Sequence, residues 1–140
     1  MEKSKLIYFS LLGNNKKLAK ERSVDKLVDV EEFASGGFLR VFQFFMGKEK
    51  LKKKVKLLNE KIRNYKNIIV YGPIWGGKPA PAVDALIRNL DVVNKSISFQ
   101  FTYTQNYEDT EKYVKEVIFQ NGGMINEIKF VQVGENRPTT

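Results

Sequence analysis

The sequence predicts an α/β fold in which a parallel sheet of five strands lies between layers of helices. Apolar runs of strand length alternate along the chain with segments whose apolar residues recur at helical spacing. This alternation is typical of consecutive β-α-β units. The run at residues 67–72 is apolar almost throughout, as expected of a central parallel strand covered on both faces. The length of 140 residues fits one domain spanning residues 1–140.

The first part of the chain contains two predicted strands and three predicted helices, one of them short. The strands are expected at residues 5–10 and 27–33, the second being the weaker, and a polar helix is expected at residues 14–22. Residues 48–63 have the clearest helical pattern, because four apolar residues recur at helical spacing. These residues are Leu51, Val55, Leu58 and Ile62. The opposite face carries a run of lysines, which we interpret as exposed to solvent. Between the second strand and this helix, residues 34–47 are expected to form a loop and a short helix that adds aromatic residues to the core.

The second part of the chain contains three predicted strands and two predicted helices. The strands are expected at residues 67–72, 97–104 and 125–133, and the helices at residues 80–90 and 109–120. Prolines stand at the start of the first helix, where a missing N–H group costs little. Acidic residues stand in the first turn of the second helix, where the helix dipole favours negative charge.

The last two strands predict a sheet that is not completely covered. Apolar and polar residues alternate in them, as in Ile97, Ser98 and Phe99, whereas interior parallel strands covered on both faces do not alternate. Few residues follow the last strand, so we expect the fifth helix of such a fold to be absent. One face of this half of the sheet is then expected to contact water or a second copy of the chain, as in a homodimer.

The composition excludes several classes of chemistry. The chain has no cysteine and no histidine, which excludes disulfides, thiolate nucleophiles, zinc–thiolate sites and hydrolases that need a histidine base. Redox chemistry would require a bound cofactor. No apolar run approaches the roughly 18 residues of a membrane helix, and no signal peptide is apparent, so we expect a cytoplasmic protein without membrane contact. The net charge is +8, but no aromatic residues alternate with the lysines, which disfavours nucleic acid as a partner.

The first strand ends in a turn suited to a phosphate group. The turn contains Ser10, Leu11, Leu12, Gly13, Asn14 and Asn15. Gly13 permits tight backbone geometry, and the N–H groups at the start of the following helix attract anions. The alternative is an ordinary turn in which Asn15 caps the helix.

The loops after the third and fourth strands are suited to a flat ligand. The first of these loops contains Pro73, Ile74, Trp75, Gly76, Gly77 and Lys78, and the second contains Thr104, Gln105 and Tyr107. Trp75 is the only tryptophan and lies outside the periodic core segments, so it either stacks on a ligand or anchors its loop. The second loop combines a hydroxyl, an amide and an aromatic ring, and its alternative is a turn with surface tyrosines.

The three loops follow the first, third and fourth strands. In the strand order 2-1-3-4-5 these strands are neighbours, and the order reverses between the first and the third. Ligands of open α/β sheets bind outside the carboxyl ends of the strands at such a reversal. We therefore predict one site, formed by all three loops, for a ligand that bears a phosphate.

The sequence resembles the flavodoxin family over nearly its whole length. Residues 7–15 (IYFSLLGNN) resemble the phosphate loop of the family, and residues 68–82 (IIVYGPIWGGKPAPA) resemble the strand and loop that flank the flavin ring. The resemblance implies a three-layer sandwich, non-covalently bound FMN, and electron transfer or a flavin-dependent oxidoreductase activity. It also implies a redox partner protein or a small-molecule electron acceptor.

Carried over by position, the resemblance assigns the predicted loops to parts of FMN. Ser10, Gly13, Asn14 and Asn15 would hold the phosphate, residues 73–77 would line the ring beside Lys78, and Thr104, Gln105 and Tyr107 would lie on its other side. Leu12 and Asn15 stand where the family usually has threonines, so hydroxyl donors are missing. This departure supports a second hypothesis, an interaction domain of the same fold that has lost FMN binding.

Overall fold

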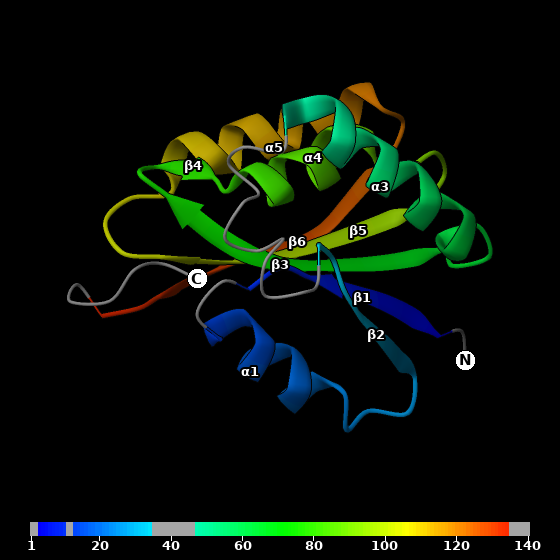
Figure 1. Cartoon of the computed structure of the whole chain (residues 1–140), viewed down its shortest axis with the longest axis horizontal. Coiled ribbons are helices and arrows are strands. Elements are labelled where there is room, and N and C mark those ends of the chain that lie inside the picture. Colours follow the sequence, from blue (N-terminus) through cyan, green and yellow to red (C-terminus); the bar gives the residue numbers. More distant parts are fainter. Residues whose placement is uncertain (1–2, 11–12, 35–46, 135–140) are drawn as a thin grey trace.

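In the computed structural model, residues 3–10, 13–34 and 47–134 are described, and their strands form one mainly parallel sheet (Figure 1). The long strands stand in the order β2-β1-β3-β5-β6, which confirms the predicted order, and the short β4 pairs antiparallel with the end of β3. The strands are β1 Ser4–Tyr8, β2 Val28–Glu32, β3 Asn67–Trp75, β4 Lys78–Pro79, β5 Ser96–Tyr103 and β6 Met124–Gln132. Except at the end of β3, the predicted strand boundaries agree with the observed ones within two residues.

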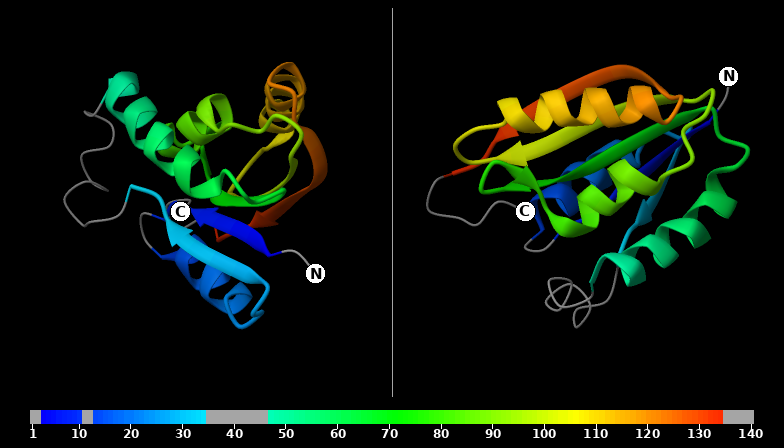
Figure 2. Two further views of the ribbon diagram at one scale, coloured as in Figure 1. Left: turned by 90° about the vertical axis from the view of Figure 1, so that its right-hand side faces the viewer. Right: turned by 90° about the horizontal axis from the view of Figure 1, so that it is seen from above.

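Helices cover the sheet on both faces and complete the predicted three layers (Figures 1 and 2). Among the described helices, only α1, Asn14–Arg22, lies on one face. The other face carries α3, α4 and α5, which span Gly47–Ile62, Pro81–Asn89 and Glu108–Gln120. The apolar residues predicted for the first of these three helices, Leu51, Val55, Leu58 and Ile62, are all buried.

The alternation of side chains along the strands divides the core into two parts. In β1, Ile7 belongs to the larger core beneath α3, α4 and α5, whereas Leu6 belongs to a smaller core beneath α1. The parallel register places Leu6 beside Ile69 of β3, whose side chain is also in the smaller core. The two cores hold the carboxyl ends of β1, β3 and β5 at one edge of the sheet, which is where the predicted site lies.

A glycine in β3 allows α4 to approach the sheet closely. A Cβ atom added at Gly72 would lie 2.3 Å from Cγ2 of Val83, a distance that real Cβ atoms do not reach. Val83 is fully buried in the larger core. The position of α4, which follows the β3–β4 hairpin, therefore depends on the absence of a side chain at Gly72.

The described residues cover the half of the sheet formed by β5 and β6 incompletely on the α1 face. In β5, Ser96, Ser98 and Gln100 are half-buried on this face, as the alternation predicts, while their apolar neighbours are buried on the other. A polar hollow of about 310 Å³ lies along these strands and reaches Arg22 of α1.

Two sequence predictions fall on residues that the structure does not describe. The predicted aromatic segment at residues 34–47 falls almost entirely on residues 35–46, and the question of a further helix after β6 concerns residues 135–140. Among the described residues, no helix is long and apolar enough to cross a membrane.

Candidate functional site

The three predicted loops meet at the carboxyl edge of the sheet. The side chain of Asn15 donates a hydrogen bond of 2.9 Å from Nδ2 to Oγ1 of Thr102, near the end of β5. The rings of Phe9 and Trp75 meet edge to face with centroids 6.2 Å apart. The hydroxyl of Thr110, in α5, donates to the carbonyl of Gly77 over 3.1 Å. These contacts join the turn after β1, the end of β3 and the region after β5 into one rim.

The turn between β1 and α1 presents a helix N-terminus without negative charge. Gly13 caps α1 with a φ of 109°, a left-handed conformation that favours glycine, and its carbonyl accepts a hydrogen bond from the N–H group of Lys17. The first turn of α1 holds no acidic residue, whereas Lys16 and Lys17 are exposed there. The partial positive charge of the helix end and these ammonium groups favour an anion.

Two side chains of this turn are buried and hold its shape. Ser10 is 1% exposed and accepts a hydrogen bond of 3.0 Å from the N–H group of Gly13. Asn15 is fully buried inside the first turn of α1, so the alternative that made it the helix cap is wrong, and Gly13 is the cap. The predicted residues Leu11 and Leu12 lie outside the described part of the chain.

The predicted loop after the third strand is a β-hairpin. Strand β3 continues to Trp75, which pairs with Lys78 of β4, so the prediction that Trp75 lies in the loop after this strand is wrong. Gly76 and Gly77 form the turn with φ values of 59° and 82°. Two consecutive positive φ angles are typical of the two-residue hairpin turn whose twist matches the strands. The hairpin holds Trp75 half-buried at the rim.

Pro73 and Ile74, also predicted at the site, are buried. Ile74 is 2% exposed and belongs to the larger core, so only its backbone can contact a ligand. The carbonyl of Pro73 accepts a hydrogen bond from the N–H group of Ala80 over 3.0 Å, which fixes the hairpin to the start of α4. These two residues therefore anchor the hairpin that carries the half-buried Trp75 and the glycine turn.

Aromatic residues form the other side of the rim. Tyr107 stacks on Phe130 of β6 with ring centroids 4.1 Å apart, and it meets Tyr103 edge to face at 5.0 Å. The predicted residues Thr104 and Gln105 lie beside them, half-buried and exposed respectively. Sequence reasoning missed Phe130. Its position in β6, directly beside β5, was the signal that could have identified it.

The hairpin turn and the loop after β5 lie against each other. A Cβ atom added at Gly77 would lie 2.8 Å from Oδ1 of Asn106, in the loop after β5. The side chain of Asn106 therefore lies against Gly77, so the two loops are in contact at this point. A Cβ atom added at Gly76 would meet no atom within 4 Å, and Gly76 is exposed.

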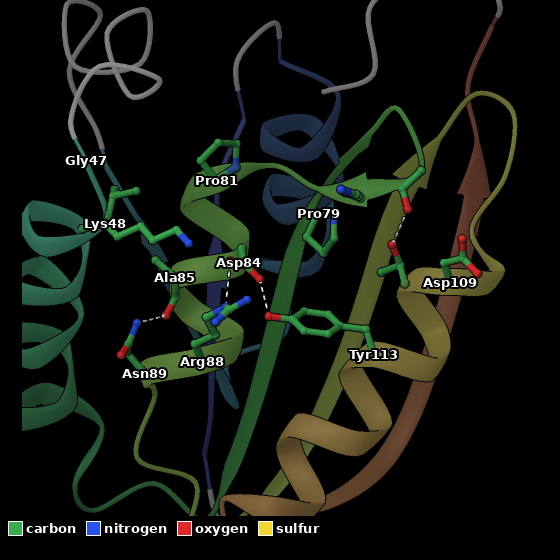
Figure 3. A pocket seen from close by; sticks show the side chains of 14 residues that line it. Gly47, Lys48, Pro79, Pro81, Asp84, Ala85, Arg88, Asn89, Asp109 and Tyr113 are labelled. Carbon is green, nitrogen blue, oxygen red and sulfur yellow. Dashed lines mark hydrogen bonds and ion pairs between the residues drawn. The ribbon is translucent and has the colours of Figure 1, made fainter.

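A cavity of about 670 Å³ lies beside the hairpin, between α3, α4 and α5 (Figure 3). The phenol of Tyr113 crosses its wall and donates a hydrogen bond of 2.5 Å to Oδ1 of Asp84. Nε of Arg88 donates to the other oxygen of Asp84 over 3.0 Å. Burial, together with the hydrogen bond to Asp84, raises the pKa of Tyr113 to about 12 from its ordinary value of 10.

We expect alkaline pH to weaken the fold through Tyr113. Because its folded pKa is raised from 10 to about 12, its stabilising contribution is complete below pH 10 and is lost as the pH rises through 12. The measurement is the free energy of unfolding against pH for the wild type and the Tyr113→Phe variant. The wild type should lose more stability than the variant between pH 10 and 12. Parallel curves for the wild type and the variant would contradict the raised pKa of Tyr113.

Comparisons with known proteins identify structures of the same architecture. No protein-family model matches the chain, and no curated protein matches its sequence. Among solved structures, the chain is similar to general stress protein 14 of Treponema denticola in complex with FMN, with a TM-score of 0.67 at 8% identity, covering 94% of this chain and 86% of the other. It is similar to a flavoprotein of Lactobacillus acidophilus in complex with FMN, with a TM-score of 0.56 at 17% identity and 93% coverage of each chain. It is also similar to a flavodoxin of Streptococcus pneumoniae TIGR4, with a TM-score of 0.55 at 15% identity, covering 95% of this chain and 87% of the other.

Proposed function

We propose that this chain, which has the flavodoxin-like fold, binds FMN non-covalently at the rim formed by the β1–α1 turn, the β3–β4 hairpin and the β5–α5 loop. The observation that carries the proposal is that these loops contact one another where the strand order reverses, with Trp75 at the rim. The FMN complexes of two structural neighbours support it. Electron transfer to a partner protein, or reduction of a small molecule, is the proposed role.

The phosphate of FMN is assigned to the β1–α1 turn. Ser10 and Asn15 are buried and bonded within the protein, so their role is to hold the turn. The contacts to phosphate come instead from backbone N–H groups at the start of α1 and from Asn14, with Lys16 and Lys17 adding positive charge. A turn of this kind fits a dianion because its first helical turn carries cations and no carboxylate.

The flavin ring is assigned to the space bordered by Trp75 and Tyr107. Trp75 offers a large aromatic surface that can cover one face of a flat ring and exclude water from it. The backbone at Gly76, with no side chain and open space around it, can approach the polar edge of the ring. Thr104 and Gln105 provide further hydrogen-bonding groups on the opposite side.

The flavin, when bound, would supply the redox chemistry, since the chain has no cysteine or histidine of its own. The protein contributes position and electrostatics. Lys78 is exposed and pairs with Trp75 in the hairpin, so it adds positive charge at the rim. Such a charge favours the anionic reduced form of the cofactor.

The proposal is tested by titrating the purified protein with FMN and, separately, with riboflavin, which lacks the phosphate. We expect FMN to quench the fluorescence of Trp75 to saturation at one equivalent and to remain with the protein through desalting. Riboflavin should bind at least about tenfold more weakly, since charge-assisted hydrogen bonds to phosphate contribute on the order of 1.5–3 kcal/mol. A protein that binds neither flavin would contradict the proposal, and equal affinity for both would contradict the phosphate assignment.

A second candidate is an interaction domain that no longer binds FMN. The observation in its favour is the side chain of Asn15, which is buried against Thr102 in the phosphate turn. This hypothesis predicts that neither flavin binds, so the same titration distinguishes the two candidates.

A further inference from the structure

The cavity between α3, α4 and α5 is distinct from the rim to which FMN is assigned. None of the proposed phosphate contacts, nor Trp75 or Tyr107, lines it. It shares Gly77 and Lys78 with the β3–β4 hairpin. Its volume of about 670 Å³ lies in the range of pockets that hold small organic molecules.

Part of the cavity wall is apolar. Leu51 of α3 is 3% exposed and Ala85 of α4 is 7% exposed, and Pro79 and Pro81 complete this surface at the hairpin and the start of α4. Apolar lining with a few polar groups is typical of binding sites for organic ligands. The ligand is therefore expected to have an apolar body.

The acceptor groups near the middle of the cavity are already engaged. Both carboxylate oxygens of Asp84 accept hydrogen bonds, one from Tyr113 and one from Arg88. The side-chain amide of Asn89 donates to the carbonyl of Ala85, and the hydroxyl of Thr110 donates to the carbonyl of Gly77. The acidic side chain that faces the middle of the cavity, Asp84, is thus paired with Arg88 and hydrogen-bonded to Tyr113.

A positive charge faces the middle of the cavity. Lys48, from the first turn of α3, extends its ammonium group across the opening toward α4 (Figure 3). Lys78 adds a second exposed ammonium at the hairpin. The carboxylate of Asp109 lies on the far side of Tyr113 from Lys48 (Figure 3). The middle of the cavity therefore favours a negative charge.

We propose that this cavity binds a small organic anion, an apolar body that carries one carboxylate or sulfonate group, with the anionic group beside Lys48. The apolar body contacts Leu51, Pro79 and Ala85, and the ring of Tyr113 closes one side. The inference does not depend on FMN binding, because no residue that contacts the phosphate or stacks on the ring is used.

The test is a fluorescence titration with anilinonaphthalene sulfonate, an apolar dye with one anionic group, and with phenylnaphthylamine, its neutral counterpart. The sulfonate should bind at one saturable site, and the neutral dye more weakly. Lys48→Gln should weaken sulfonate binding by about two- to fivefold, as expected for an exposed ion pair. Lys52→Gln, an exposed lysine of the same helix that does not line the cavity, is the matched control and should leave binding unchanged.

Three results would overturn the inference: no saturable binding, equal affinity for both dyes, or equal effects of the two lysine substitutions. A further titration in the presence of saturating FMN separates the two sites. The sulfonate should bind the FMN-loaded protein with unchanged affinity, whereas competition would place it at the rim and refute a second site. If the protein binds no FMN, the proposed function fails while the dye titrations still decide this inference.

Discussion

Replacing Trp75 with alanine is expected to raise the dissociation constant for FMN by about 5- to 150-fold, because stacking a flat heterocycle on an aromatic side chain contributes on the order of 1–3 kcal/mol. The hairpin holds Trp75 half-buried, and its ring and that of Phe9 meet edge to face. The remaining aromatic surface should stay available to the ring. The measurement is a titration that follows the fluorescence of the flavin, since the variant has no tryptophan.

Two variants control for indirect effects of this substitution. Trp75→Phe keeps an aromatic ring and should lose less affinity than Trp75→Ala. Phe119→Ala removes an exposed aromatic residue of α5, 82% of whose surface is accessible, and should leave FMN binding unchanged. If Trp75→Ala remains folded and binds FMN as tightly as the wild type, Trp75 does not cover the ring.

Replacing Gly72 with alanine is expected to destabilise the fold by about 1–3 kcal/mol, because the new methyl group overpacks the core. The added Cβ atom would lie 2.3 Å from Cγ2 of Val83 and 3.2 Å from Cγ1. Either β3 or α4 must move, and α4 begins directly after the hairpin. The measurement is the free energy of unfolding in urea.

The matched substitution for this test is Gly134→Ala, where an added Cβ atom meets no atom within 4 Å. It should leave the stability unchanged within the error of the measurement. A second control combines Gly72→Ala with Val83→Ala, which removes the clashing methyl groups. The double variant should be more stable than the sum of the two single effects predicts. Simple additivity of the two effects would contradict the steric explanation.

Local patterns were sufficient to predict the architecture. Helix α3 was identified from four apolar residues at helical spacing, and all four are buried on its inner face. The continuous apolar run of β3 and the alternation in β5 distinguished a central strand from a partly uncovered one. These predictions succeeded because burial against a sheet imposes a fixed periodicity on the sequence.

The details of the site depend on contacts that no local pattern encodes. The bond from Asn15 to Thr102 joins positions 87 residues apart. It buries a side chain that the sequence placed at the phosphate or, in the alternative, at the helix cap. The stacking of Tyr107 on Phe130 likewise needs the register of β6 beside β5. The hairpin was predictable in principle, since two glycines between short extended segments favour a two-residue turn. The cavity depends on the spacing of three helices, which sequence periodicity does not specify.

The most direct test of the central claim is to map FMN binding by two-dimensional amide NMR of the labelled protein. The account predicts that FMN shifts the signals of Gly13 and Asn14, the indole N–H of Trp75, and the amide of Thr104 together, at one saturable site. These groups come from the three loops that the contacts join into one rim. Shifts confined to one loop, shifts confined to the cavity at Leu51 and Ala85, or no shifts would contradict the claim that the three loops form a single FMN site.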